Sequence, residues 1–225
     1  MRSAPASAAP KAAPKPPRRT QAQRRDEMRG RLLDAAVEVL RIKGHAGFRT
    51  AEVAAQAGVS QGALTHHFSS KDDLILAALE HVFRQATERG TRRAHRVKTV
   101  DGVLRLLIED SRDFFFSDLF LIAMELAIFA RTETPNGAQI RAISRTHRMA
   151  VEDAWIDALT AAGVPARMAE DLLWLTNSIV RGLAVRRLWQ DDPARFERLV
   201  LLWRRMAISY LCEHDARRPR RSGSP

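Results

Sequence analysis

The segment from Thr50 to Leu74, TAEVAAQAGVSQGALTHHFSSKDDL, constrains the fold of this chain more than any other part of the sequence. It predicts two short helices, over about residues 50–57 and 61–67, that flank a tight turn. Gly58 supplies the positive φ that such a turn needs, and Ala54 is small where the two helices must approach each other. Apolar contacts that fix the crossing angle come from Val53, Val59 and Leu64. Together these features predict a helix-turn-helix.

The rest of the chain also follows helical periodicity. Four apolar residues recur at helical spacing and predict a first helix from about residue 23 to Lys43, which Gly44 ends; they are Leu33, Ala36, Val37 and Leu40. Further helices begin after residues that favour the N-cap position, namely Ser60, Ser70, Thr99, Ser117, Thr134 and Asp192. The alternation typical of strands is not found. The sequence therefore predicts an all-α protein of about nine helices.

Positive charge is concentrated at the two ends of the chain. The formal net charge is +11, but residues 1–31 hold nine basic and two acidic residues, and residues 213–225 hold four basic and two acidic ones. The body between them is nearly neutral, so total charge says little about what it binds. We divide the chain into a disordered basic arm (1–22), a helix-turn-helix domain (23–79), a second helical domain (80–213) and a frayed basic tail (214–225). The arm is either simply solvated or adds contacts to DNA.

Residue usage argues against several classes of protein. The single cysteine, Cys212, cannot form an intrachain disulfide, and no Cys and His residues have the spacing of a zinc site, which favours the cytoplasm. The most apolar stretch, residues 119–130, is interrupted by Glu125 and is too short to cross a membrane. The adjacent His66 and His67 point in different directions on a helix, so we expect no metal there. Catalytic motifs are missing as well, and we expect neither an enzyme nor a cofactor.

Residues 25–79 closely resemble the DNA-binding domain of the TetR family of one-component transcriptional regulators. The resemblance rests on LLDAAVEVL in the first helix, on Gly44 and Phe48, on TAEVAAQAGVS and on GALTHHFSSKDDLILAAL. The family usually has tyrosine where this chain has Thr65. The resemblance implies a homodimeric regulator, and we expect a repressor that a small-molecule effector releases from a palindromic operator in double-stranded DNA.

In this family the second helix of the motif enters the major groove, which implies roles for four residues. Ser60, Gln61, Gly62 and Thr65 would lie nearest the base edges. Gln61 is the best candidate for a bidentate contact to adenine. Gly62 would let the backbone come close to the DNA.

Other residues match positions that hold phosphates in the family. Thr50 and Lys71 are the two clearest matches. Because Thr65 lacks the reach of a tyrosine, its phosphate contact is either lost or passed to His66 or His67. The first helix carries arginines that either contact phosphates or form a solvated face, namely Arg25, Arg29 and Arg31.

The second domain is expected to form the dimer. Two long helices, at about 166–190 and 193–213, carry apolar residues at helical spacing. The family resemblance implies that such a pair meets its two-fold mate in a four-helix bundle; the alternative is that these residues pack within their own domain. The interface residues we expect are Leu172, Leu175, Ile179, Leu183, Leu199, Trp203 and Met206.

The same domain is expected to hold a pocket for a hydrophobic or aromatic effector. From a pool that also includes Phe114, Phe115 and Phe129, we expect the lining residues to be Phe116, Phe120, Met124, His147, Trp155, Trp174 and Asn177. The alternative is that these aromatic residues form the core, as aromatic side chains at helical spacing more often do.

The sequence is also consistent with two other functions. One is a non-specific architectural DNA-binding protein whose affinity comes from the basic arms and falls steeply with salt. The other is an all-α ligand-binding protein or enzyme in which the DNA-binding motif is vestigial.

Overall fold

The computed structural model describes residues 20–129 and 135–216, and all the regular structure in these two ranges is helical. The helices are α1 (Gln21–Gly47), α2 (Thr50–Ala57), α3 (Gln61–His67), α4 (Lys71–Ala94), α5 (Val100–Phe115), α6 (Asp118–Phe129), α7 (Pro135–Ala161), α8 (Ala166–Arg186) and α9 (Pro193–Ala216). The all-α prediction is confirmed. The arm before residue 20, Thr134 and the tail after residue 216 lie outside the described residues.

Helix α1 begins two residues earlier than predicted because of a capping box. The Thr20 hydroxyl accepts a hydrogen bond from the Gln23 N–H, and the Gln23 side chain accepts one from the Thr20 N–H. At the other end, Gly44 has a φ of +64° and breaks the regular helix where the sequence predicted its end. A last piece of α1, residues 45–47, then leads to the buried Phe48.

Helices α2 and α3 have the bounds that the sequence predicted. Gly58 has a φ of +66° and ends α2, and Ser60 caps α3 by accepting a hydrogen bond from the Ala63 N–H at 3.1 Å. Val53 and Leu64 are buried between these helices and α1. The helix-turn-helix is thus fixed by its turn, its caps and its shared core.

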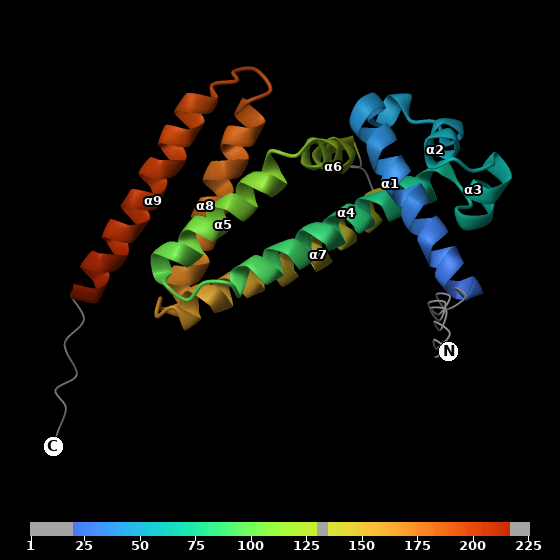
Figure 1. The fold of residues 1–225 in the computed structure, drawn as a ribbon. Coiled ribbons are helices and arrows are strands. Elements are labelled where there is room, and N and C mark those ends of the chain that lie inside the picture. Colours follow the sequence, from blue (N-terminus) through green and yellow to red (C-terminus); the bar gives the residue numbers. More distant parts are fainter. Residues whose placement is uncertain (1–19, 130–134, 217–225) are drawn as a thin grey trace, which may run out of the picture.

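Helix α4 connects the helix-turn-helix to the rest of the molecule. It runs without interruption through residue 79, so the predicted domain boundary lies inside a helix. Along most of its length α4 lies beside α7, and both helices run in the same direction (Figure 1). The Thr87 hydroxyl on α4 donates to the His147 carbonyl on α7 at 3.0 Å. The packed pair of α4 and α7 leads away from α3 (Figure 1).

Two main clusters of buried side chains form the core. One joins α1–α4 to Ile122, Ala123 and Ile140, which come from α6 and α7. The other joins α5, α7, α8 and α9, with α9 at the outer edge (Figure 1). Helix α8 ends at Arg186, four residues before the predicted end, and the described helices include none long and apolar enough to span a membrane.

Candidate DNA-binding surface and ligand cavity

Helix α3 exposes one face and buries the other. Ser60, Gln61, Gly62 and Thr65, the four residues predicted nearest the base edges, are all exposed. Leu64, on the opposite face, is buried in the core of the helix-turn-helix. The helix is therefore anchored from behind while its polar face is accessible, as a recognition helix requires.

The side chain of Gln61 is held in place by Thr50. Its Nε2 donates to the Thr50 hydroxyl at 3.1 Å, which links the start of α3 to the start of α2. A carboxamide has two N–H groups and one oxygen, so this bond leaves groups with which a base can pair. The exposed Thr65 uses its hydroxyl within its own helix, where it donates to the Gly62 carbonyl at 3.0 Å.

Lys71 and Arg31 are both involved in bonds that stabilise the fold. The half-buried Lys71 ammonium lies 3.4 Å from the His45 carbonyl and 5.9 Å from the centre of the Phe48 ring. Arg31 donates to the Ala57 carbonyl at the end of α2. The sequence predicted that Arg31 contacts a phosphate or lies on a solvated face. Its role as a cap for α2 was not predicted.

The two histidines at the end of α3 have different surroundings. His66 is exposed, whereas His67 is half-buried beside the ring of the buried Phe68. Partial burial, assisted by the charges of Arg25 and Arg29 and by His66, lowers the pKa of His67. The guanidinium of Arg29 also stacks 4.6 Å from the centre of the Phe68 ring. Within residues 20–129 and 135–216, no cluster of three or more His, Cys, Asp and Glu residues could hold a metal.

A cavity of about 570 Å³ lies in the second half of the molecule, between α4, α5, α6, α7 and α8. Four of the predicted residues line it: Phe120, Met124, Trp174 and Asn177. Trp174 is 69% exposed and lies at its edge. The remaining lining residues are Phe83, Phe114, Phe115, Ala123, Ser144, Arg145, Arg148, Met149, Glu152, Ser178 and Arg181. The sequence placed Phe114 and Phe115 in the pool, but it gave no signal for the arginines.

Three predicted pocket residues lie elsewhere. Trp155 is 1% exposed, and its Nε1 donates to Asp110 Oδ2 at 3.2 Å, so it belongs to the core. Phe116 packs on Phe196 of α9, with 6.2 Å between the ring centres. His147 lies on the side of α7 that faces α4, where its carbonyl accepts the Thr87 hydroxyl.

A chain of polar contacts joins the cavity wall to the core. Arg148 Nη2 lies 3.3 Å from Glu152 Oε1, and Asn177 Nδ2 donates to the same oxygen at 3.3 Å. The Ser111 hydroxyl donates to Asn177 Oδ1 at 2.8 Å. Burial lowers the pKa of Arg148, despite the nearby carboxylates of Glu152 and Asp110.

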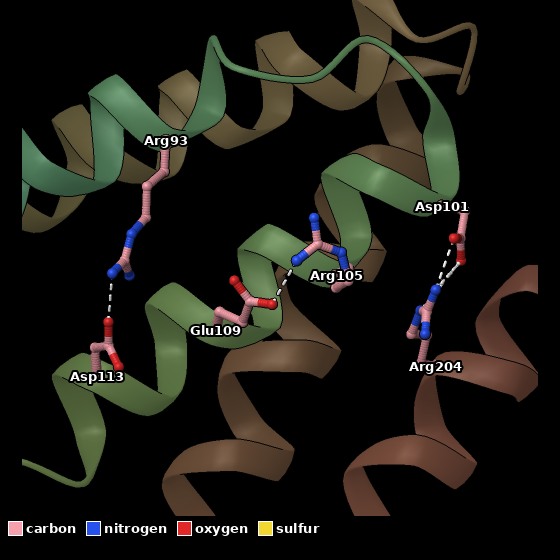
Figure 2. A network of polar contacts seen from close by, with 6 residues as sticks. All are labelled: Arg93, Asp101, Arg105, Glu109, Asp113 and Arg204. Carbon is pink, nitrogen blue, oxygen red and sulfur yellow. Dashed lines mark hydrogen bonds and ion pairs between the residues drawn. The ribbon is translucent and has the colours of Figure 1, made fainter.

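Ion pairs join helix α5 to α4 and to α9. Figure 2 shows Asp113 facing Arg93 of α4 and Asp101 facing Arg204 of α9, each with a shortest N–O distance of 2.6 Å. Arg105 and Glu109 pair along the surface of α5 itself. Arg93 also lies 3.5 Å from the buried Asp110, whose pKa is raised by burial.

The predicted dimer residues divide into two groups. Leu172 and Leu183 are buried in the core of the chain itself, as the alternative of packing within their own domain expects. Ile179 and Trp203 pack against that core, and Trp203 Nε1 donates to Thr176 Oγ1 at 3.0 Å. The exposed group is Leu175 (48% exposed), Leu199 (40%) and Met206 (58%). On α9 the exposed stripe also includes two residues that were not predicted as interface, Leu202 and Tyr210.

Residues 32–78 match the family described as "Bacterial regulatory proteins, tetR family". The HTH-type transcriptional regulator CymR of Pseudomonas putida is 45% identical over 184 residues, which cover 82% of this chain and 91% of that protein. Among solved structures, a putative TetR-family regulator from Mesorhizobium loti has a TM-score of 0.66 and 14% identity, covering 83% of this chain and 98% of that one. A putative regulator from Saccharomonospora viridis, in complex with choline, has a TM-score of 0.62 and 19% identity, covering 82% and 95%.

Proposed function

The chain belongs to the tetR family of bacterial regulatory proteins and is a DNA-binding transcriptional regulator, and from this premise we propose that it is a homodimeric repressor. It binds a palindromic operator through α3, and a small hydrophobic or aromatic effector in the cavity releases it. Its site of action is the cytoplasm. The observation that carries the proposal is the exposed face of α3, with Gln61 held by Thr50 and the helix anchored by the buried Leu64.

Gln61 is the proposed source of sequence specificity. A carboxamide forms a bidentate pair with adenine, and discrimination by such a pair is worth about 1–3 kcal/mol per base. The hydrogen bond that Gln61 donates to Thr50 reduces the rotamer freedom that Gln61 would lose on binding. Lys71 and Thr50 are proposed to contact phosphates at the edges of the recognition helix, and His66 is accessible for a further contact.

An exposed apolar stripe supports the dimer. Leu199, Leu202, Met206 and Tyr210 follow one face of α9, and Leu175 is exposed on the neighbouring α8. A contiguous apolar surface of this kind typically marks a protein interface. Two subunits related by two-fold symmetry present two copies of α3, so the operator requires two half-sites about one helical turn or a multiple apart.

The cavity supports a role for an effector because its walls include residues of the core that stabilises the helix-turn-helix. Phe83 of α4 and Ala123 of α6 line the cavity and also belong to the core cluster of α1–α4. A ligand that moves α4 or α6 therefore changes the packing of the core that holds α3. An effector shifts the population toward the arrangement that it binds best, and release follows when that arrangement does not fit both half-sites.

The proposal is tested by selecting sequences from a random double-stranded DNA library with the full chain. We expect an enriched palindrome, bound by two subunits. Recovery of no common sequence, with affinity that falls steeply with salt, would instead favour a non-specific architectural protein.

The dimer is tested with Leu199→Glu/Met206→Glu, which places charges on the exposed stripe. We expect a monomer in sedimentation and loss of palindrome binding. Leu201→Glu is the matched control, because Leu201 is 43% exposed but points away from the stripe. A double variant that stays dimeric would exclude this face as the interface.

A further inference from the structure

The first turns of α1 project beyond the core of the helix-turn-helix. Residues 20–27 are all exposed, and the first buried side chain of the helix is that of Leu32. The capping box at Thr20 keeps these turns helical although none of their side chains is buried. Packing of the described core therefore does not explain why the helix extends this far.

The projecting turns lie at the C-terminal end of α3. Partial burial and the charges of Arg25 and Arg29 lower the pKa of His67, the last residue of α3. The guanidinium of Arg29 also stacks on Phe68, the residue that follows α3. Thr20 lies about 8 Å further along the helix axis than Arg25, at a rise of about 1.5 Å per residue. The chain before Thr20 is therefore attached beside the recognition helix.

The part of the basic arm that precedes Thr20 carries charge of one sign only. Residues 1–19 hold five basic residues and no acidic one. DNA bound to α3 brings one phosphate charge for about every 1.7 Å of duplex to the place where this segment is attached. A fully extended segment of this length can span roughly 60 Å, more than the roughly 34 Å of one turn of DNA. Phosphates outside the half-site are thus within its reach.

The basic tail carries the same kind of charge at the opposite end of the molecule. Residues 217–225 hold four basic residues and no acidic one. They follow α9, whose last turn lies far from α3 (Figure 1). Net charge treats the arm and the tail alike, whereas their points of attachment favour DNA contact by the arm alone. The chain therefore contains its own matched control.

We propose that the basic arm binds the phosphates of duplex DNA that flanks the operator, outside the half-site that α3 reads. The proposal rests on the recognition through α3 proposed above and adds a second contact surface to it. Phosphate contacts carry no sequence information, so the arm raises affinity while Gln61 selects the sequence. In a two-fold dimer the two arms contact both flanks.

The test neutralises the arm or the tail in the full chain. The arm variant is Arg2→Gln/Lys11→Gln/Lys15→Gln/Arg18→Gln/Arg19→Gln, and the matched tail variant is Arg217→Gln/Arg218→Gln/Arg220→Gln/Arg221→Gln. Affinity is measured for the selected palindrome alone and for the same palindrome with about 10 base pairs, one turn of DNA, added at each end. Circular dichroism checks that both variants fold as the wild-type chain does.

The wild-type chain and the tail variant are expected to bind the longer duplex about tenfold or more tightly than the shorter one. The arm variant is expected to bind the two duplexes within about threefold of each other. On the longer duplex, arm neutralisation is also expected to lower the slope of log affinity against log salt concentration by about two or more per subunit, because each neutralised phosphate contributes about 0.9. A flank preference that survives arm neutralisation, or an equal loss of slope in both variants, would overturn the proposal.

A hydroxyl-radical footprint on the longer duplex locates the contact. We expect the wild-type chain and the tail variant to protect the backbone beyond the outer edges of both half-sites, and the arm variant to lose that protection. Identical footprints for the two variants contradict the proposal.

Failure of recognition through α3 gives a different result, because the palindrome and a scrambled duplex would then bind equally. The effect of the arm on the salt slope is also measured on a scrambled duplex of the longer length, since its contacts do not depend on sequence. The same order of slopes is expected there, and equal slopes for the arm variant and the tail variant would again overturn the proposal.

Discussion

The contact between α4 and α7 yields the sharpest prediction about stability. Gly90 lies on α4 against α7, and a Cβ there would overlap Val151 Cγ2 and approach Asp110 Oδ2 to 2.9 Å. Gly30, in α1, is also inside a helix, but a Cβ there meets no described atom within 4 Å. We therefore compare Gly90→Ala with Gly30→Ala as its matched control.

The magnitude follows from two effects. Alanine stabilises a position inside a helix by about 0.5–1 kcal/mol relative to glycine, because less backbone entropy is lost on folding. At Gly90 the new methyl group must displace Val151 and Asp110, both buried, and overpacking of this kind costs about 1–3 kcal/mol. Displacement of Asp110 also strains its hydrogen bond from Trp155. The two variants are thus expected to differ in free energy of unfolding by about 1–3 kcal/mol, with Gly90→Ala the less stable.

The assay is urea unfolding followed by circular dichroism, with all proteins at one concentration because the stability of the proposed dimer depends on concentration. In thermal unfolding of a chain of this size, each kcal/mol of this difference is expected to shift Tm by about 2–4 °C. A Gly90→Ala protein that is as stable as Gly30→Ala would refute the close packing of α4 on α7.

Three further predictions concern single side chains. The lowered pKa of His67 means that the folded chain favours the neutral imidazole, which adds stability above the pKa of an unfolded histidine and loses it as the pH falls. We therefore expect His67→Gln to lose less free energy of unfolding than the wild-type chain between about pH 7.5 and 5.5. Trp155→Phe removes a hydrogen bond to the buried Asp110 and is expected to cost about 1–3 kcal/mol in urea unfolding, with partial recovery in Trp155→Phe/Asp110→Asn. Arg31→Ala is expected to lower the free energy of unfolding and to leave the salt dependence of operator binding unchanged. Lys71→Met is expected to lower the slope of log affinity against log salt concentration by about one per subunit. Equal slopes for these two variants would assign Lys71 a purely structural role.

The helix-turn-helix was predictable from sequence because its signals are local. Gly58 and Ser60 determine the turn and the start of α3 within a few residues of themselves, and the structure places those boundaries as predicted. The resemblance to the TetR family uses the same local pattern.

The cavity was predictable only in part, because its walls come from five helices. Trp174 and Phe120 were found by their residue type, but so was Trp155, whose indole points to the buried Asp110 instead. Arg148 was missed because arginine is common on surfaces, and only the packing of α7 against α5 and α8 encloses it.

The face of the helix on which each predicted dimer residue lies was also not predictable from sequence. A helix in a bundle has one face toward its own core and another toward a partner, and both faces are apolar. Leu172 and Leu175 are three residues apart, yet only Leu175 is exposed. Periodicity identifies the apolar residues, and assigning them to a face requires the position of the neighbouring helices.

The central claim is that this nearly neutral body recognises sequence through α3, and one comparison tests it most directly. Affinity is measured for the selected operator and for a scrambled duplex, over a series of salt concentrations, with the wild-type chain and with Gln61→Ala. Gln190→Ala, outside the helix-turn-helix, is the control. We predict that Gln61→Ala lowers the ratio of specific to non-specific affinity about fivefold or more while the salt slope stays the same. An unchanged ratio would contradict recognition through α3.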